Sequence, residues 1–144
     1  MTNFYYNEGF PSRFQHVRYF LVNLSENHSF PKVNSWVNQS ECKMYVQASL
    51  AGYKPEEVDI TVDATEQTIT FESKKVNEEP DENIKWDIRE IKGTSFKRTF
   101  QVDNTVNLKK YDSNYADGIV TIIFDLKTDE ELGKTKIKIG EKNG

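Results

Sequence analysis

The chain has 144 residues, of which 36% are hydrophobic, and its 23 acidic and 19 basic residues give a formal net charge of −4. This length fits one domain with short arms, and interleaved charges without a basic stripe exclude nucleic acid as an expected partner. One cysteine excludes an intramolecular disulfide. No membrane is expected and we predict a cytoplasmic location, because the sequence starts without a secretory signal pattern and its apolar runs fall far short of the roughly 20 residues that span a bilayer.

The first quarter of the chain is rich in aromatic side chains. Residues 1–36 hold nine of the eighteen Phe, Tyr and Trp residues. Four apolar residues recur at the spacing of one helix face, namely Phe10, Phe14, Val17 and Leu21. This spacing predicts a short amphipathic helix near residues 13–22. Because Asn-rich segments flank it, we expect residues 1–32 to form a partly helical, partly disordered arm.

From about residue 33 the apolar residues follow a period of two. Met44, Val46 and Ala48 share one face of a predicted half-buried strand. Further strand candidates follow at short intervals, at residues 58–63, 68–73, 94–102, 109–115 and 119–125. Asp117-Gly118 between the last two is typical of a tight hairpin turn, since Gly tolerates a positive φ. Residues 33–126 are therefore predicted to form an all-β domain, an antiparallel β-sandwich.

A long charged loop interrupts these strands between Ser73 and Gly93. Within it Ile84, Trp86 and Ile88 alternate with polar residues and give the loop an apolar face that needs a partner. Two interpretations remain open. Either a neighbouring subunit covers this face, or the loop folds back as a strand on its own sheet.

The chain ends in a polar segment, and residues 127–144 are predicted to form an extended C-terminal tail. Ile137 and Ile139 stand close to its end, separated by one lysine. In an extended chain they project to the same side. An isolated pair of this kind behind a polar tether is typical of a ligand for a groove.

Four motifs in this order resemble the small heat-shock protein family and its α-crystallin domain. They are Ala48-Ser49-Leu50-Ala51-Gly52, Phe96-Lys97-Arg98-Thr99-Phe100, Asp117-Gly118-Ile119-Val120-Thr121-Ile122 and Ile137-Lys138-Ile139. The chain departs from the family pattern at Ala51, where Pro is preferred, and at Val120, where Leu is usual. The resemblance implies an immunoglobulin-like antiparallel β-sandwich that forms dimers by exchanging a loop strand, as in the bacterial and plant type.

The resemblance also implies the surfaces that hold the assembly together. The expected dimer interface consists of Trp36, Val37, Ile84, Trp86, Ile88 and Arg98. Arg98 is either paired with a carboxylate, from Asp87 or Glu90, or is a plain surface arginine. The tail isoleucines are expected to dock in a groove on another dimer, whose walls include Ile60, Val62, Tyr111 and Ser113.

The function implied is that of an ATP-independent chaperone of the stress response, a holdase that binds partly unfolded client proteins and assembles as oligomers of dimers. The client-binding side chains are expected in the aromatic arm: Phe4, Tyr5, Phe10, Phe14, Val17, Phe20 and Leu21. An alternative role for these side chains is to hold the interior of the oligomer together.

An enzyme is not expected from this sequence. The two histidines, His16 and His28, lie in the arm, away from Cys42, so no catalytic set, metal site or cofactor is predicted. Two alternative functions remain, a co-chaperone-like β-sandwich binding module and a structural sandwich protein of a larger assembly. A monomeric mass would favour the co-chaperone module and a multi-dimer particle the small heat-shock protein, and suppression of client aggregation without ATP would separate a chaperone from a structural component.

Overall fold

The computed structural model describes residues 10–26, 30–74, 81–91 and 95–140. Two short 3₁₀-helices, η1 (Ser12–Phe14) and η2 (Pro55–Glu57), lie among eight strands. The strands are β1 (Leu21–Asn23), β2 (Val33–Asn38), β3 (Lys43–Ser49), β4 (Val58–Asp63), β5 (Thr68–Ser73), β6 (Phe96–Val102), β7 (Val106–Ala116) and β8 (Ile119–Leu126).

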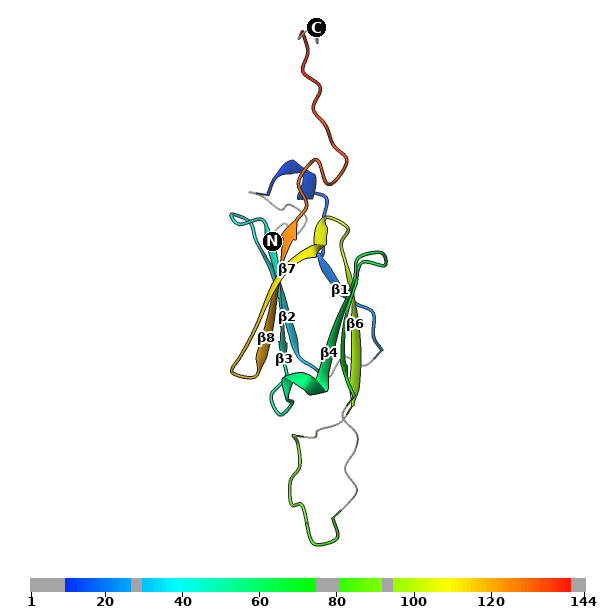
Figure 1. Cartoon of the computed structure of the whole chain (residues 1–144), viewed down its shortest axis with the longest axis vertical. Coiled ribbons are helices and arrows are strands. Elements are labelled where there is room, and N and C mark those ends of the chain that lie inside the picture. Colours follow the sequence, from blue (N-terminus) through cyan, green and yellow to red (C-terminus); the bar gives the residue numbers. More distant parts are fainter. Residues whose placement is uncertain (1–9, 27–29, 75–80, 92–94, 141–144) are drawn as a thin grey trace, which may run out of the picture.

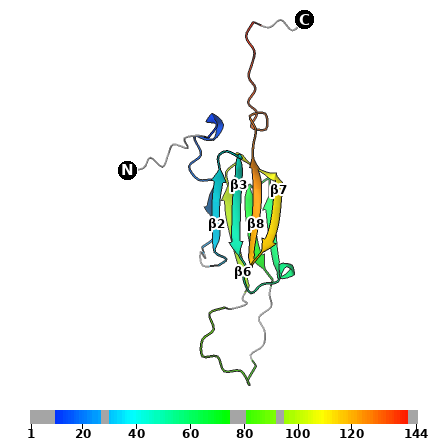
Figure 2. The same ribbon diagram turned by 90° about the vertical axis from the view of Figure 1, so that its left-hand side faces the viewer.

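The strands form two four-stranded sheets that face one another (Figure 1). One sheet has the order β1-β6-β5-β4, and the other has the order β2-β3-β8-β7, seen face on in Figure 2. Every neighbouring pair is antiparallel. The prediction of an all-β antiparallel sandwich is confirmed.

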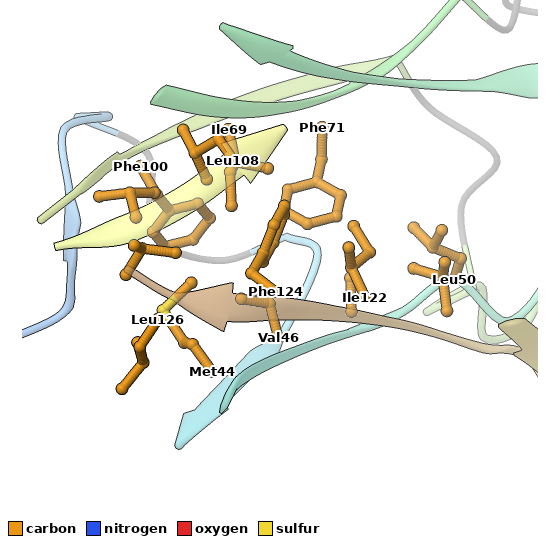
Figure 3. Close-up of a cluster of buried hydrophobic side chains, with 14 of the residues drawn as sticks. Met44, Val46, Leu50, Ile69, Phe71, Phe100, Leu108, Ile122, Phe124 and Leu126 are labelled. Atoms are coloured by element: carbon orange, nitrogen blue, oxygen red, sulfur yellow. The ribbon is translucent and has the colours of Figure 1, made fainter. Parts of the chain in front are cut away.

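The core lies between the sheets because each inner strand is apolar on one face only. In β3 the side chains of Met44, Val46 and Ala48 are fully buried, as their period of two predicts. Phe71 and Phe124 enter the same core from β5 and β8 (Figure 3). Burying a side chain of this size stabilises the fold by roughly 1.5–3 kcal/mol, so the sandwich rests on these residues.

The hairpin between β7 and β8 has the predicted tight turn. Asp117 and Gly118 have φ values of 55° and 76°, which is the combination that a two-residue hairpin loop requires. The carbonyl of Gly118 accepts a hydrogen bond of 2.7 Å from the backbone N–H of Leu50. The turn is therefore fixed to the loop that follows β3.

The helix predicted near residues 13–22 is wrong. Only η1 is helical there, and β1 pairs with the outer edge of β6. Phe14 and Val17 are 0% and 3% exposed. Tertiary contacts explain the difference. The open edge of β6 forms hydrogen bonds with the backbone of β1, and the ring of Phe14 is buried in the core. Together these contacts outweigh the weak local preference for a helix.

The loop and the tail leave the sandwich at opposite ends (Figure 1). Residues 81–91 contain no strand, so the interpretation in which this segment folds back on its own sheet is wrong for the described part of the loop. In the tail, Ile137 and Ile139 are 88% and 99% exposed. In the described residues we find no helix with the length and apolar character needed to cross a membrane.

Candidate functional site: two open edges of the sandwich

One open edge of the sandwich lies between β4 and β7, the last strands of the two sheets. A groove of about 430 Å³ runs along this edge. Its walls contain all four residues inferred for tail docking, Ile60 and Val62 from β4 and Tyr111 and Ser113 from β7. Each pair is two residues apart, so both members project from the same face of their strand. The four side chains meet because the two sheets face one another at this edge.

The floor of this groove is apolar. Val120 and Ile122 of β8 contribute to it, together with Ala64 and Leu108 near one end. A smaller pocket of about 140 Å³ shares Ile60 and Val120 with the groove and extends it. Its lining is completed by Leu50, Tyr53, Lys54, Pro55, Val58 and Tyr115. Such a surface is suited to branched alkyl side chains of an extended peptide.

The other open edge lies between β1 and β2. A pocket of about 310 Å³ opens there, lined by Phe10, Arg18, Tyr19, Phe20, Leu21, Ser35, Trp36 and Val37. Trp36 is 42% exposed and stacks on Tyr45, with ring centroids 5.0 Å apart and an interplanar angle of 6°. Among the described strands only β3 pairs with β2, so the other side of β2 has backbone groups available for a further strand.

The loop residues inferred for the dimer interface are exposed. Ile84, Trp86 and Ile88 are 53%, 57% and 77% exposed, and the guanidinium of Arg89 lies 4.5 Å from the centroid of the Trp86 ring. No strand pairing joins residues 81–91 to β2. The inferred interface has two halves, Trp36 with Val37 on β2 and the three loop residues. Within one chain no strand pairing joins these two halves.

Arg98 lies on β6, where it anchors the arm. Its Nε donates a hydrogen bond of 3.1 Å to Oδ1 of Asn23, and its Nη1 donates one of 2.6 Å to the carbonyl of Pro31. The guanidinium lies 4.8 Å from the centroid of the Phe100 ring. Burial lowers the pKa of Arg98 below its usual value, but the group stays charged. Neither Asp87 nor Glu90 is an ion-pair partner of Arg98 within the described chain.

The arm residues inferred for client binding differ in exposure. Phe4 and Tyr5 lie outside the described residues. Phe14 and Val17 are buried, and Phe10 is 9% exposed with its ring centroid 6.1 Å from that of Phe20. Phe20 and Leu21 are half-buried against the core. Client binding through the buried members therefore requires that this part of the arm leaves the sandwich.

Sequence reasoning missed a turn at the start of the tail. Glu131 accepts hydrogen bonds from the backbone of Thr128 and from the side chain of Asn107. These bonds, the first above all, and the charge of Lys110 hold the pKa of the Glu131 carboxyl below its usual value. The spacing Thr128-x-x-Glu131 is that of a capping box, the signal that predicts such a turn.

The described residues contain no cluster of three or more His, Cys, Asp or Glu side chains that could hold a metal ion. Cys42, the free cysteine, sits in the β2–β3 turn with a φ of 52°.

Two antiparallel four-stranded sheets, with a groove at one edge, define the described residues as an immunoglobulin-like β-sandwich. A family model described as the Hsp20/alpha crystallin family matches residues 36–140. The chain belongs to this family, which implies a chaperone role.

Individual relatives are distant in sequence. Small heat shock protein C4 of Rickettsia felis is 22% identical over 133 residues, which cover 92% of this chain and 80% of that protein. A solved small heat-shock protein from Xylella fastidiosa superimposes with a TM-score of 0.61 at 15% identity, covering 81% of this chain and all of that chain. Heat shock protein 16.0 from Schizosaccharomyces pombe gives a TM-score of 0.57 at 21% identity, with 80% and 86% covered. These structures share the fold.

Proposed function

We propose that this chain is an ATP-independent holdase, which binds partly unfolded proteins, prevents their aggregation and assembles as oligomers of dimers. The observation that supports the proposal is that one chain carries both an apolar groove and an exposed pair of isoleucines suited to it. Ile60, Val62, Tyr111 and Ser113 line an open apolar groove, while Ile137 and Ile139 stand exposed on the tail. Docking of these isoleucines in the groove of another dimer would link the dimers.

The energy of one such contact explains why the assembly would be reversible. Burying two isoleucines contributes roughly 3–6 kcal/mol, at about 1.5–3 kcal/mol each. Association itself costs at least about 4 kcal/mol. One tail therefore binds weakly, and several tails acting together hold the particle through their raised effective concentration. Dimers can then leave and exchange.

The proposed dimer uses the other open edge. The available side of β2 and the exposed, alternating Ile84, Trp86 and Ile88 complement each other between two chains. Addition of the loop as a strand would satisfy the backbone of β2 and bury these side chains beside Trp36 and Val37. The small heat-shock protein from Xylella fastidiosa has a distinct high order structure, which supports higher assembly here.

Clients would be bound by the apolar side chains of the arm. Rings and aliphatic groups on a segment that can leave the sandwich cover many different apolar surfaces without a fixed pocket. We place this activity in the cytoplasm and expect it to require no cofactor, nucleic acid or membrane. Its partners are copies of itself and partly unfolded proteins.

The test is to heat an aggregation-prone client with the purified full chain in the absence of ATP and to follow light scattering. Scattering should fall as the chain is added in stoichiometric amounts, and the particles should have masses that are multiples of a dimer. The Ile137→Ser/Ile139→Ser variant should yield folded dimers, whereas the neighbouring Lys136→Ser should leave the particles large. A monomer that leaves client scattering unchanged would contradict the proposal.

A further inference from the structure

The first part of the tail is a closed turn. The backbone N–H of Thr128 donates to Oε1 of Glu131 at 3.1 Å, and the backbone N–H of Glu131 donates to Oγ1 of Thr128 at 3.2 Å. Three further backbone hydrogen bonds of 2.8 to 3.0 Å, donated by Leu132, Gly133 and Lys134, close the same turn. The predicted polar tether is thus folded over residues 128–134.

This turn is fastened to the sandwich. Oε2 of Glu131 accepts a hydrogen bond of 2.6 Å from Nδ2 of Asn107, which is 8% exposed, and lies 4.0 Å from Nζ of Lys110. Leu132 packs half-buried against the core. On the other side, Nε of Arg13 donates to the carbonyl of Lys127 at 2.9 Å. Glu131 takes part both in the turn and in its attachment to the sandwich. Its Oε1 accepts the hydrogen bond from Thr128 that closes the turn, and its Oε2 accepts the hydrogen bond from Asn107 of β7.

The anchored turn leaves a short tether before the motif. Only Thr135 and Lys136 separate Lys134 from Ile137, a reach of about 10 Å for three fully extended steps. From the turn the tail extends away from the sandwich in both views (Figures 1 and 2). Release of the turn would free residues 128–136, beyond the bond of Arg13 to Lys127, and extend the reach to about 35 Å.

A freed tail would meet the groove of its own chain first. Leu108 and Lys109, which line one end of the groove, directly follow the anchoring residue Asn107. A flexible tether of about ten residues creates an effective concentration in the millimolar range, far above the micromolar concentration of other chains that a free dimer meets before a particle has formed. Docking within the chain would then outcompete docking between dimers.

We propose that Glu131, held by Asn107, is a positioning residue that directs the tail away from the groove of its own chain and so commits Ile137 and Ile139 to a groove on another dimer. The inference rests on the proposed tail docking and deepens it. It names the residue that selects docking between dimers over docking within a chain.

The test compares Glu131→Ala with Glu130→Ala, which removes the same charge at the exposed preceding residue, whereas the bonds to Asn107 and Lys110 of β7 belong to Glu131. Native mass spectrometry at fixed subunit concentration measures assembly, and hydrogen exchange measures the amides of Leu132 and Lys134. We expect Glu131→Ala to speed exchange at both amides and to raise the dimer fraction several-fold. Glu130→Ala should change neither.

Hydrogen exchange along β7 identifies where the freed tail goes. In dimers of the Glu131→Ala variant the groove-facing stretch around Tyr111 should remain as protected as in the parent particle, because the tail occupies its own groove. In dimers of Ile137→Ser/Ile139→Ser the same amides should exchange faster. Loss of protection in both variants would overturn the proposal.

Two further outcomes count against it. Particles of parent mass despite faster exchange in Glu131→Ala would show that the turn does not direct the tail, and unchanged exchange would show that Glu131 is not its anchor. The Ile137→Ser/Ile139→Ser variant separates failure of the positioning role of Glu131 from failure of the proposed tail docking. If that variant dissociates while Glu131→Ala does not, tail docking stands and the positioning role falls; if it stays assembled, both fall.

Discussion

At the scale of single residues, Arg98 shows how one side chain can hold a segment distant in sequence. Its guanidinium bonds the side chain of Asn23 and the carbonyl of Pro31 while it covers the ring of Phe100. These contacts fasten the end of β1 and the segment that leads into β2. An additional carboxylate partner across a dimer remains a prediction, and the role visible in one chain is that of an internal anchor.

We therefore predict that Arg98→Ala destabilises the fold by roughly 1.5–3 kcal/mol, the range for a hydrogen bond that involves a charged group. Urea unfolding at fixed protein concentration measures the change. Arg98→Lys should recover only part of the loss, because an ammonium lacks the planar fork that reaches both acceptors. Lys97→Ala, the exposed neighbour on β6, is the control and should leave the unfolding midpoint unchanged. Equal midpoints for Arg98→Ala and Lys97→Ala would refute the anchor role.

At the scale of elements, residues 81–91 have the sequence pattern of a β-strand but form no strand within one chain. Its alternation of Ile84, Trp86 and Ile88 has the period of a β-strand, yet within one chain these side chains stay exposed. The unpaired side of β2 offers the missing ladder, and only a second chain brings the two together in the proposed dimer.

Replacing Ile84, Trp86 and Ile88 together by Ser is predicted to yield monomers that remain folded, since these side chains are outside the core. Analytical ultracentrifugation measures the mass. Asn83→Ser/Lys85→Ser is the matched control, because it changes two polar residues of the opposite parity in the same segment and should leave the dimer intact. Dimers that persist in the triple variant would contradict the exchanged-strand interface.

At the scale of the whole molecule, the arm is both part of the fold and the proposed client surface. Phe14 and Val17 are buried, and β1 extends one sheet, so residues 10–26 contribute to stability. Loss of a buried phenylalanine alone costs about 3–5 kcal/mol. A truncation that removes the whole arm therefore changes the fold and the client surface at once.

A shorter truncation separates the two. Deletion of residues 1–9 removes Phe4 and Tyr5 and keeps residues 10–26, so we expect weaker suppression of client light scattering, with the melting temperature as the check that the sandwich is retained. Deletion of residues 1–26 should lower the melting temperature as well. Full protection of the client by the chain that lacks residues 1–9 would exclude Phe4 and Tyr5 from client binding.

The sequence by itself determined the sandwich, and through the family resemblance it identified four of the residues that line the groove. A strand with one buried face must alternate, so Met44, Val46 and Ala48 identify β3, and the positive φ of a two-residue turn identifies Asp117-Gly118. The resemblance then assigned Ile60, Val62, Tyr111 and Ser113 to one groove, and the structure places them there because each pair shares a strand face.

Only the tertiary structure decided the arm, the partners of Arg98 and the turn that begins the tail. The spacing of Phe10, Phe14 and Val17 fits a helix, but the core and the edge of β6 are available to this segment and outweigh its local preference. Asn23 and Pro31 are far from Arg98 in the chain, as Asn107 is from Glu131. Local patterns report periodicity, whereas contacts between distant residues exist only once the sheets have brought them together.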